Sequence, residues 1–239
     1  MPSTKICAAL FFALIGGAPR AGLAQGDIFP AQKGTRWTYE GEVSWQAPGG
    51  GIHIEKAQLQ WQMEVVDSIE RGPLKVALIS GHPGDLAFYD ENRKRGCYLL
   101  LVADNRYVYL RRCDPMLSRE KLSLPDGGLE GLIHEEDLIF KLPLHQGEVF
   151  GPEQGRGQRD DTFYEWSVEE VRPAAPRGIA GVSFDKPQTE YVVICRTMPD
   201  HQIATYIPGV GLTHYVYSHH GTASDVDMKL VRFDSPGAQ

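Results

Sequence analysis

Histidines are densest in the C-terminal part of the chain, where their imidazoles could serve as metal ligands or general bases. They are His201, His214, His219 and His220. On an extended strand His214 and His220 would share one face, whereas His219 would point away from it. Protein zinc sites need three or four convergent ligands, and these histidines lack a fixed ligand spacing. We therefore expect exposed or hydrogen-bonded histidines and no metal site.

A short acidic run at residues 134–137 (His-Glu-Glu-Asp) could perform acid–base chemistry. Paired carboxylates do so only where burial separates their pKa values, and a solvated run before Leu138 explains the same residues. Gly-x-Ser-x-Gly and His-Glu-x-x-His motifs are absent from the sequence. Asp225 and Asp227 are too sparse for a calcium loop. We expect no enzyme activity and no cofactor, with a metal- or carboxylate-dependent hydrolase as the alternative.

Aromatic side chains alternate with polar residues in two neighbouring segments. Trp37, Tyr39 and Trp45 share one parity in the first segment, and Trp61 and Met63 share one parity in the second. This pattern is typical of half-buried strands. The apolar face either packs as a core or, if the sheet curves without closing, lines a concave cavity. The residues predicted to line such a cavity are Trp37, Tyr39, Trp45, Trp61, Met63, Tyr164 and Trp166.

Two cysteines flank a predicted hairpin. A three-residue turn at residues 104–106 pairs position 103 with 107, which sets Cys97 opposite Cys113. Opposed positions bring Cβ atoms to about 4.5–5.5 Å, near the separation that a disulfide needs. We predict a Cys97–Cys113 disulfide, with two half-buried thiols as the alternative. Cys195 is interpreted as a core thiol, because no neighbour in the sequence suggests an activating base.

The first 24 residues have the pattern of a secretory signal peptide. Lys5 supplies the positive charge, residues 6–15 form an apolar run, and small residues precede a plausible cleavage site after Ala24. The run is shorter than the roughly 20 residues that span a bilayer; a retained anchor is the alternative. We expect an exported protein, periplasmic or secreted, with no transmembrane segment in its mature chain.

The net charge argues against polyanionic partners. The chain carries a formal net charge of −7 at pH 7 with its basic residues scattered. Such a chain is a poor binder of nucleic acid and is poorly suited to anionic membrane surfaces.

Short strand patterns, punctuated by Gly, Pro, Asp and Asn, dominate the rest of the sequence. They predict a mainly β fold with little helix: a curved antiparallel sheet, a half-barrel or incomplete barrel, of about ten or more strands. We also expect a bulge near Lys56-Ala57, because Ile52 and Ile54 have the opposite parity to Trp61. The further strand candidates are residues 74–80, 86–89, 98–103, 107–112, 163–171, 191–197, 203–207, 212–218 and 226–233.

One phrase occurs twice in the chain. Residues 29–37 and 142–150 share the skeleton apolar-Pro-x-x-x-Gly-x-x-aromatic. Proline cannot donate to a ladder and glycine supplies a tight turn, so each copy suits the approach to a strand. We predict one β-rich domain over residues 25–239, made of two related halves at about 28–136 and 140–233.

These phrases, together with residues 206–212 (Tyr-Ile-Pro-Gly-Val-Gly-Leu), resemble motifs of exported bacterial proteins whose function is uncharacterised. Many of those proteins look like half-barrel lipoproteins related to the lipoprotein carrier of the periplasm. The resemblance implies an antiparallel sheet wrapped around an apolar cavity, and it carries no catalytic residues. This chain lacks a lipobox cysteine, which implies a protein without a lipid tether.

The sequence therefore predicts a non-catalytic exported protein. Its partner would be a lipid, another apolar small molecule or an envelope protein, held on the concave face of the sheet. A structural or adhesive surface module is a further alternative.

Overall fold

A computed structural model describes residues 28–47, 53–123, 126–151, 163–174, 178–184 and 187–236. The predicted signal peptide over residues 1–24 lies outside this range. The described residues contain one 12-stranded sheet. Its strands are β1 (Arg36–Gln46), β2 (Ile54–Arg71), β3 (Leu74–Ser80), β4 (Cys97–Ala103), β5 (Tyr107–Cys113), β6 (Leu138–Lys141), β7 (Val149–Phe150), β8 (Trp166–Pro173), β9 (Thr189–Arg196), β10 (Asp200–Ile207), β11 (Gly211–His219) and β12 (Ser224–Asp234).

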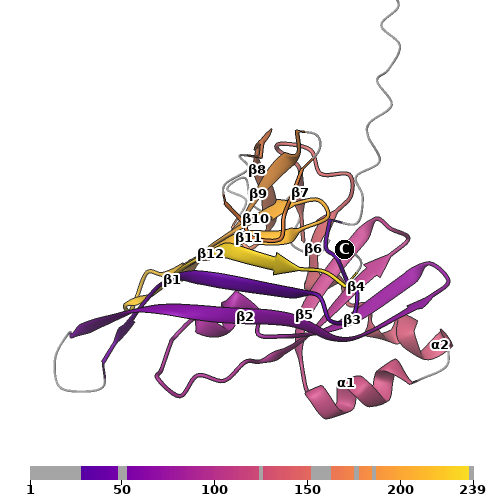
Figure 1. Ribbon diagram of the computed structural model, residues 1–239, viewed down its shortest axis with the longest axis horizontal. Coiled ribbons are helices and arrows are strands. Elements are labelled where there is room, and N and C mark those ends of the chain that lie inside the picture. The colour runs from indigo at the N-terminus through magenta and orange to yellow at the C-terminus, as the bar shows by residue number, and fades with distance from the viewer. Residues whose placement is uncertain are drawn as a thin grey trace, which may run out of the picture.

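The sheet curves into a nearly closed antiparallel barrel. Its strand order is β6-β5-β4-β3-β2-β1-β12-β11-β10-β9-β8-β7. The first and last strands of the chain, β1 and β12, pair in the middle of the sheet (Figure 1). The two end strands, β6 and β7, contact each other without a hydrogen-bonded ladder. The predicted fold class, a mainly β incomplete barrel of about ten or more strands, is confirmed.

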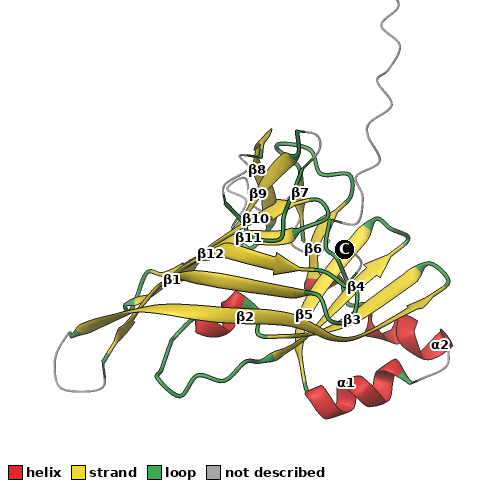
Figure 2. Ribbon diagram, in the orientation of Figure 1, coloured by secondary structure: helices red, strands yellow, loops and turns green. Residues whose placement is uncertain are grey.

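Helix is scarce in the described residues, as predicted (Figure 2). The α-helices are α1 (Pro115–Leu122) and α2 (Asp126–Leu129), and the 3-10 helices are η1 (Pro83–Leu86), η2 (Glu130–Leu132) and η3 (Glu135–Asp137). Helix α1 contacts β3 and β4 on one side of the barrel. Among the described helices, none has the length and apolar character needed to span a membrane.

The core forms where the alternating apolar faces of the strands meet inside the barrel. Trp37 and Tyr39 on β1 are fully buried, and they stand opposite Met63 and Trp61 of β2. Each also donates a hydrogen bond to a more distant part of the chain. Trp37 Nε1 donates to the Val210 carbonyl at 2.6 Å, and the Tyr39 hydroxyl donates to a carbonyl of β11 at 2.8 Å. The aromatic alternation seen in the sequence thus builds a solid core at this part of the barrel.

The first copy of the repeated phrase forms a hydrogen-bonded turn before β1. The Gly34 N–H donates to the Val65 carbonyl at 2.8 Å, and the Val65 N–H donates back to the Thr35 carbonyl at 2.9 Å. The Thr35 N–H closes the turn onto Gln32 at 3.0 Å. Gly34 has a φ of +87°, a conformation that glycine adopts without strain.

The second copy repeats this arrangement before β7. The Gly147 N–H donates to the Val168 carbonyl at 2.8 Å, the Val168 N–H returns to Glu148 at 2.9 Å, and the Glu148 N–H closes the turn onto His145 at 3.0 Å. Gly147 has a φ of +81°. Both copies are therefore the same backbone device for leading the chain into a strand, whereas the division into two related halves stays a prediction.

Replacing Gly147 by alanine tests this device. No atom lies within 4 Å of the place that an added Cβ would take at this glycine, so the expected cost is the strain of a positive φ, about 1–2 kcal/mol of unfolding free energy. Urea denaturation measures it. Gly131→Ala is the matched control, because its Cβ also meets open space and its φ is not positive. Equal stabilities of the two variants would contradict the role given to Gly147.

Two local expectations were wrong. Residues 86–89 do not form a strand, because His82 caps and Pro83 starts the 3-10 helix η1, and Phe88 then takes a φ of +53°. The ladder between β1 and β2 runs without a bulge near Lys56-Ala57, and Ile54 simply faces outward with 50% of its surface exposed. The register of β2 shifts instead against β3, between Val65 and Asp67. The short strands β6 and β7 were not predicted.

The cysteine register was predicted correctly. Cys97 on β4 pairs directly with Cys113 on β5, and their Sγ atoms lie 2.8 Å apart as unbonded thiols. Burial raises the pKa of Cys97 to about 12, with the Cys113 thiol contributing further. Cys195 is buried on β9, and burial raises its pKa to about 11. The disulfide itself stays a prediction.

We expect Cys97 and Cys113 to form this disulfide on exposure to oxidised glutathione, which accepts the two electrons while the thiols lose two protons. Intact-mass measurement without reductant should show the loss of two hydrogen atoms. Cys113→Ser should abolish the loss and Cys195→Ser should leave it unchanged. Two thiols that stay alkylatable after oxidation and unfolding would count against the bond.

Candidate functional site

An apolar cavity of about 260 Å³ lies inside the barrel, beside the segment that carries η1. Strands from both ends of the sheet contribute to it, since β4, β5 and β6 supply one side and β8, β10 and β11 the other. Its lining is mostly aromatic and aliphatic, with only a few polar groups. The lining residues are His82, Gly84, Ala87, Tyr98, Leu110, Ile139, Trp166, Gln202, Ala204, Tyr206, Tyr215 and Tyr217.

Strand alternation positions the central part of this lining. Gln202, Ala204 and Tyr206 share one parity on β10, and side chains two residues apart face the same side of a sheet. The register places Tyr217 opposite Gln202 and Tyr215 opposite Ala204. The antiparallel hairpin of β10 and β11 thus presents a continuous tyrosine-rich face to the cavity.

His82 is the most chemically distinctive lining residue. It is only 8% exposed, and its ring lies against Tyr98 and Tyr215 at centroid distances of 5.2 and 5.4 Å. Its Nδ1 accepts the Gly84 N–H at 3.0 Å, so a neutral ring carries its proton on Nε2. Burial lowers the pKa of His82 to about 4. The imidazole is therefore neutral at pH 7, with one free N–H.

Asp85 holds the η1 segment in place behind the cavity. Its buried carboxylate accepts the Gly96 N–H at 2.7 Å and the Tyr98 hydroxyl at 2.8 Å, and Arg112 lies 3.5 Å away. Burial raises the pKa of Asp85, although these partners favour its ionised form. Asp85 is not a lining residue; it positions Tyr98, which is.

The tyrosine hydroxyls of the cavity differ in whether they already have a hydrogen-bond partner in the protein. Tyr98 donates to Asp85, Tyr217 donates to Asp200 at 2.6 Å, and Tyr215 has Gln202 Oε1 at 3.4 Å. No hydrogen bond joins the Tyr206 hydroxyl to another described residue, and its oxygen is not among the fully buried unpaired atoms, so it is reachable from the cavity. Burial raises the pKa of these tyrosines, so all four stay protonated at neutral pH.

Of the residues predicted to line a cavity, the structure brings only Trp166 to this one. Trp37, Tyr39 and Met63 lie in the solid part of the core. Trp61 is half-buried and donates its Nε1–H to the Gly81 carbonyl at 2.8 Å.

The remaining two predicted residues lie near the surface. Trp45 packs edge-on against Tyr89 at 4.9 Å and lines an open groove of about 470 Å³. Tyr164 is 51% exposed just before β8. The sequence prediction missed the tyrosines of β10 and β11 and His82. The alternation Tyr215-x-Tyr217 carried the same signal as Trp37-x-Tyr39 and could have revealed part of this face.

The C-terminal histidines do not converge. His214 Nε2 lies 2.8 Å from Asp227 on the outer side of the barrel, and His219 Nδ1 accepts backbone N–H groups of the following turn. Within the part of the chain that the structure describes, no group of three or more His, Cys, Asp and Glu side chains could hold a metal ion. In the acidic run, Asp137 pairs with Arg111 at 3.7 Å.

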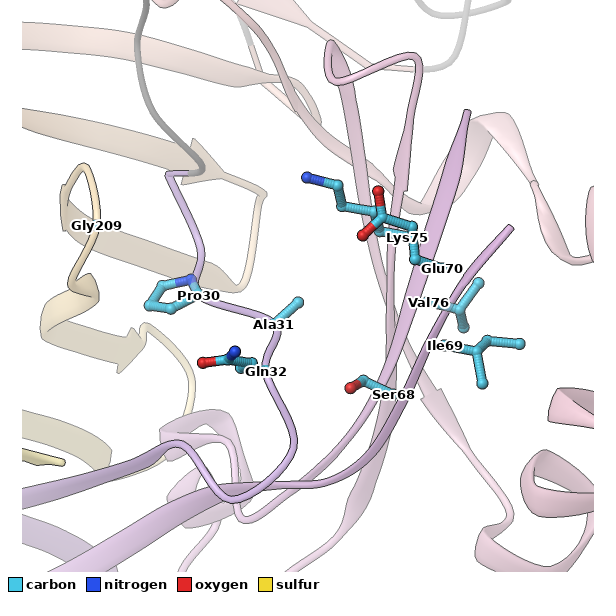
Figure 3. Close-up of a pocket in the computed structure, with 9 residues that line it drawn as sticks. All are labelled: Pro30, Ala31, Gln32, Ser68, Ile69, Glu70, Lys75, Val76 and Gly209. Atoms are coloured by element: carbon cyan, nitrogen blue, oxygen red, sulfur yellow. The ribbon is translucent and has the colours of Figure 1, made fainter. Parts of the chain in front are cut away.

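A second hollow of about 410 Å³ lies between the segment before β1 and the β2–β3 hairpin. Figure 3 shows Pro30, Ala31 and Gln32 of the segment before β1 on one side, facing the β2–β3 hairpin. Glu70 and Lys75 stand opposite each other on that hairpin. This groove has charged residues and no aromatic residue in its lining, whereas the inner cavity is lined mainly by aromatic and aliphatic side chains and is therefore the stronger candidate.

No model of a known protein family and no curated protein matches this chain. Two solved structures are similar to it. One is a candidate exported protein with a YmcC-like fold from Bacteroides fragilis, which is 10% identical with a TM-score of 0.41. The other is a candidate lipoprotein from Parabacteroides distasonis, which is 12% identical with a TM-score of 0.34. Each similarity covers 87% of this chain and 98% of the other. Similarity at this level does not identify a shared function.

Proposed function

We propose that this protein is an exported, non-catalytic binding protein that holds a small apolar molecule in the tyrosine-lined cavity. The observation that carries the proposal is the cavity itself: a space of about 260 Å³, lined mainly by apolar surface with four tyrosines and a tryptophan. Concave apolar sites with a few placed polar groups are the usual form of small-molecule sites. The signal-peptide pattern of residues 1–24 supports export.

The size of the cavity favours a ring-sized ligand over a lipid chain. An engineered apolar cavity of about 150 Å³ in another protein binds benzene, whereas drug-sized ligands occupy roughly 300–1,000 Å³. A volume of about 260 Å³ lies between these values. It suits one substituted ring or two fused rings.

Titration with ethylbenzene, followed by amide chemical shifts, tests the proposal. We expect saturable binding, with the largest shifts at Gly84, Ala204 and the Trp166 indole. Ala204 lies on the cavity wall and is 2% exposed, so Ala204→Phe should fill the space and abolish binding. If that variant fails to fold, Leu110→Trp fills the cavity from β5, where the native leucine is half-buried.

Ala31→Phe is the matched control. It introduces the same side chain into the groove of Figure 3 instead of the inner cavity, and it should leave ethylbenzene binding unchanged. No saturable binding to the wild type, or loss of binding in Ala31→Phe but not in Ala204→Phe, would overturn the proposal.

A further inference from the structure

We propose that the ligand of the inner cavity is an uncharged ring compound with one hydrogen-bond acceptor, which binds the Tyr206 hydroxyl and the His82 Nε2–H. This inference rests on the proposed function and names the chemical class that the site would select.

The lining excludes a charged ligand. None of the lining side chains is ionised at neutral pH, because His82 is neutral and the tyrosines are protonated. The two nearby carboxylates already accept hydrogen bonds from tyrosine hydroxyls, Asp85 from Tyr98 and Asp200 from Tyr217. An ionised ligand would lose its hydration without gaining an opposite charge, which is costly in an apolar interior.

Two hydrogen-bond donors of the lining have no partner among the described residues, which indicates a hydrogen-bond acceptor on the ligand. The His82 Nδ1 is occupied by the Gly84 N–H, so the remaining ring nitrogen is a donor. The Tyr206 hydroxyl makes no hydrogen bond to another described residue, so it is able to donate to a ligand in the cavity. Neither atom is among the fully buried unpaired ones, and both residues line the cavity, where an acceptor on a ligand can reach them. A carbonyl or ether oxygen has lone pairs for both donors.

The aromatic surroundings indicate a ring. Tyr206 itself packs edge-on against Phe140 at 5.1 Å, and Tyr215 packs edge-on against His82. Aromatic groups gain from such offset and edge contacts beyond the area that they bury. Together with the cavity volume, this favours a planar ring bearing a short polar substituent.

Three probes of nearly equal shape separate these features: ethylbenzene has no acceptor, acetophenone has an uncharged carbonyl, and benzoate is an anion. We expect acetophenone to bind more tightly than ethylbenzene by at least about fivefold, since each hydrogen bond contributes about that factor, and benzoate to bind most weakly. Tyr206→Phe should lower acetophenone affinity about fivefold, because it removes one of the two donors, and it should lower ethylbenzene affinity much less. This variant should fold normally, because it keeps the ring of Tyr206, with its edge-on contact to Phe140, and removes only the hydroxyl.

Tyr89→Phe is the matched control, because it makes the same change outside the cavity, where Tyr89 packs against Trp45; it should keep the preference for acetophenone. If ethylbenzene binds but acetophenone gains nothing, or Tyr206→Phe and Tyr89→Phe behave alike, the inference is wrong and the binding function stands. If benzoate binds best, the site selects anions and the inference is also wrong. If none of the probes binds, the proposed function itself fails.

Discussion

Trp37→Ala should lower the free energy of unfolding by about 3–5 kcal/mol, the range for removing a large aromatic from a core. Trp37 is fully buried, and its ring packs against Phe29 at 5.3 Å and Phe233 at 5.7 Å. The substitution also leaves the Val210 carbonyl without the indole N–H that it accepts at 2.6 Å. A loss of this size would threaten folding altogether, since domains are stable by only about 5–15 kcal/mol.

Urea denaturation at pH 7 measures this loss of unfolding free energy. Two further variants separate the contribution of the indole hydrogen bond from that of ring burial. Trp37→Phe keeps most ring contacts and removes the indole N–H, so we expect an intermediate loss. Trp45→Ala is the matched control, because the same residue type there is only half-buried. If Trp37→Phe were as stable as the wild type but bound ethylbenzene poorly, Trp37 would be a ligand-binding residue, as its sequence pattern predicts, and not a core residue.

Acidification should destabilise the protein by about 3 kcal/mol between pH 7 and pH 4 through His82 alone. Burial holds the pKa of His82 at about 4, against an ordinary value of 6.5. Above pH 6.5 the imidazole is neutral in both states and this group exerts no pH dependence. As the pH falls below 6.5, His82 binds a proton in the unfolded chain but stays neutral in the folded protein, so the free energy of unfolding decreases as the pH falls toward 4. Asp85, whose pKa burial raises, acts in the opposite direction.

Urea denaturation between pH 4.5 and pH 7.5 checks this slope in the wild type and in His82→Gln. Glutamine can still accept the Gly84 N–H but does not titrate, so the variant should show a much shallower loss on acidification. His220→Gln, at an exposed turn position, should keep the wild-type slope. A His82→Gln slope equal to that of the wild type would assign the acid sensitivity to other groups.

Alternation and turn chemistry predicted most of the fold. Strand β3 (Leu74–Ser80) and the cysteine register of β4 and β5 follow directly from apolar runs and a short turn. Strands β6 and β7 are only four and two residues long, too short for a period to be recognised. Leu138, Ile139, Phe140 and Phe150 of these strands are buried. We attribute this burial to the meeting of the two ends of the sheet, which is a property of closure and not of local sequence.

The candidate site was harder to predict because its residues depend on closure. An inward-facing aromatic looks the same in sequence whether it meets a solid core or a void. Tyr39 and Tyr206 both alternate inward, yet Tyr39 donates to the Leu212 carbonyl while Tyr206 borders the cavity. His82 gave no periodic signal, since it lies in a loop whose position is set by Asp85 and distant strands.

The pairing of β1 with β12 sets the largest sequence separation between paired strands of the sheet. Every other ladder of the sheet joins strands that are consecutive in the chain, whereas this one brings Arg36 opposite Asp234. Contact order, and with it the entropic barrier to folding, is therefore concentrated in a single ladder. A circular permutant that joined the two termini and opened the chain between β6 and β7 would order all twelve strands consecutively along the sheet.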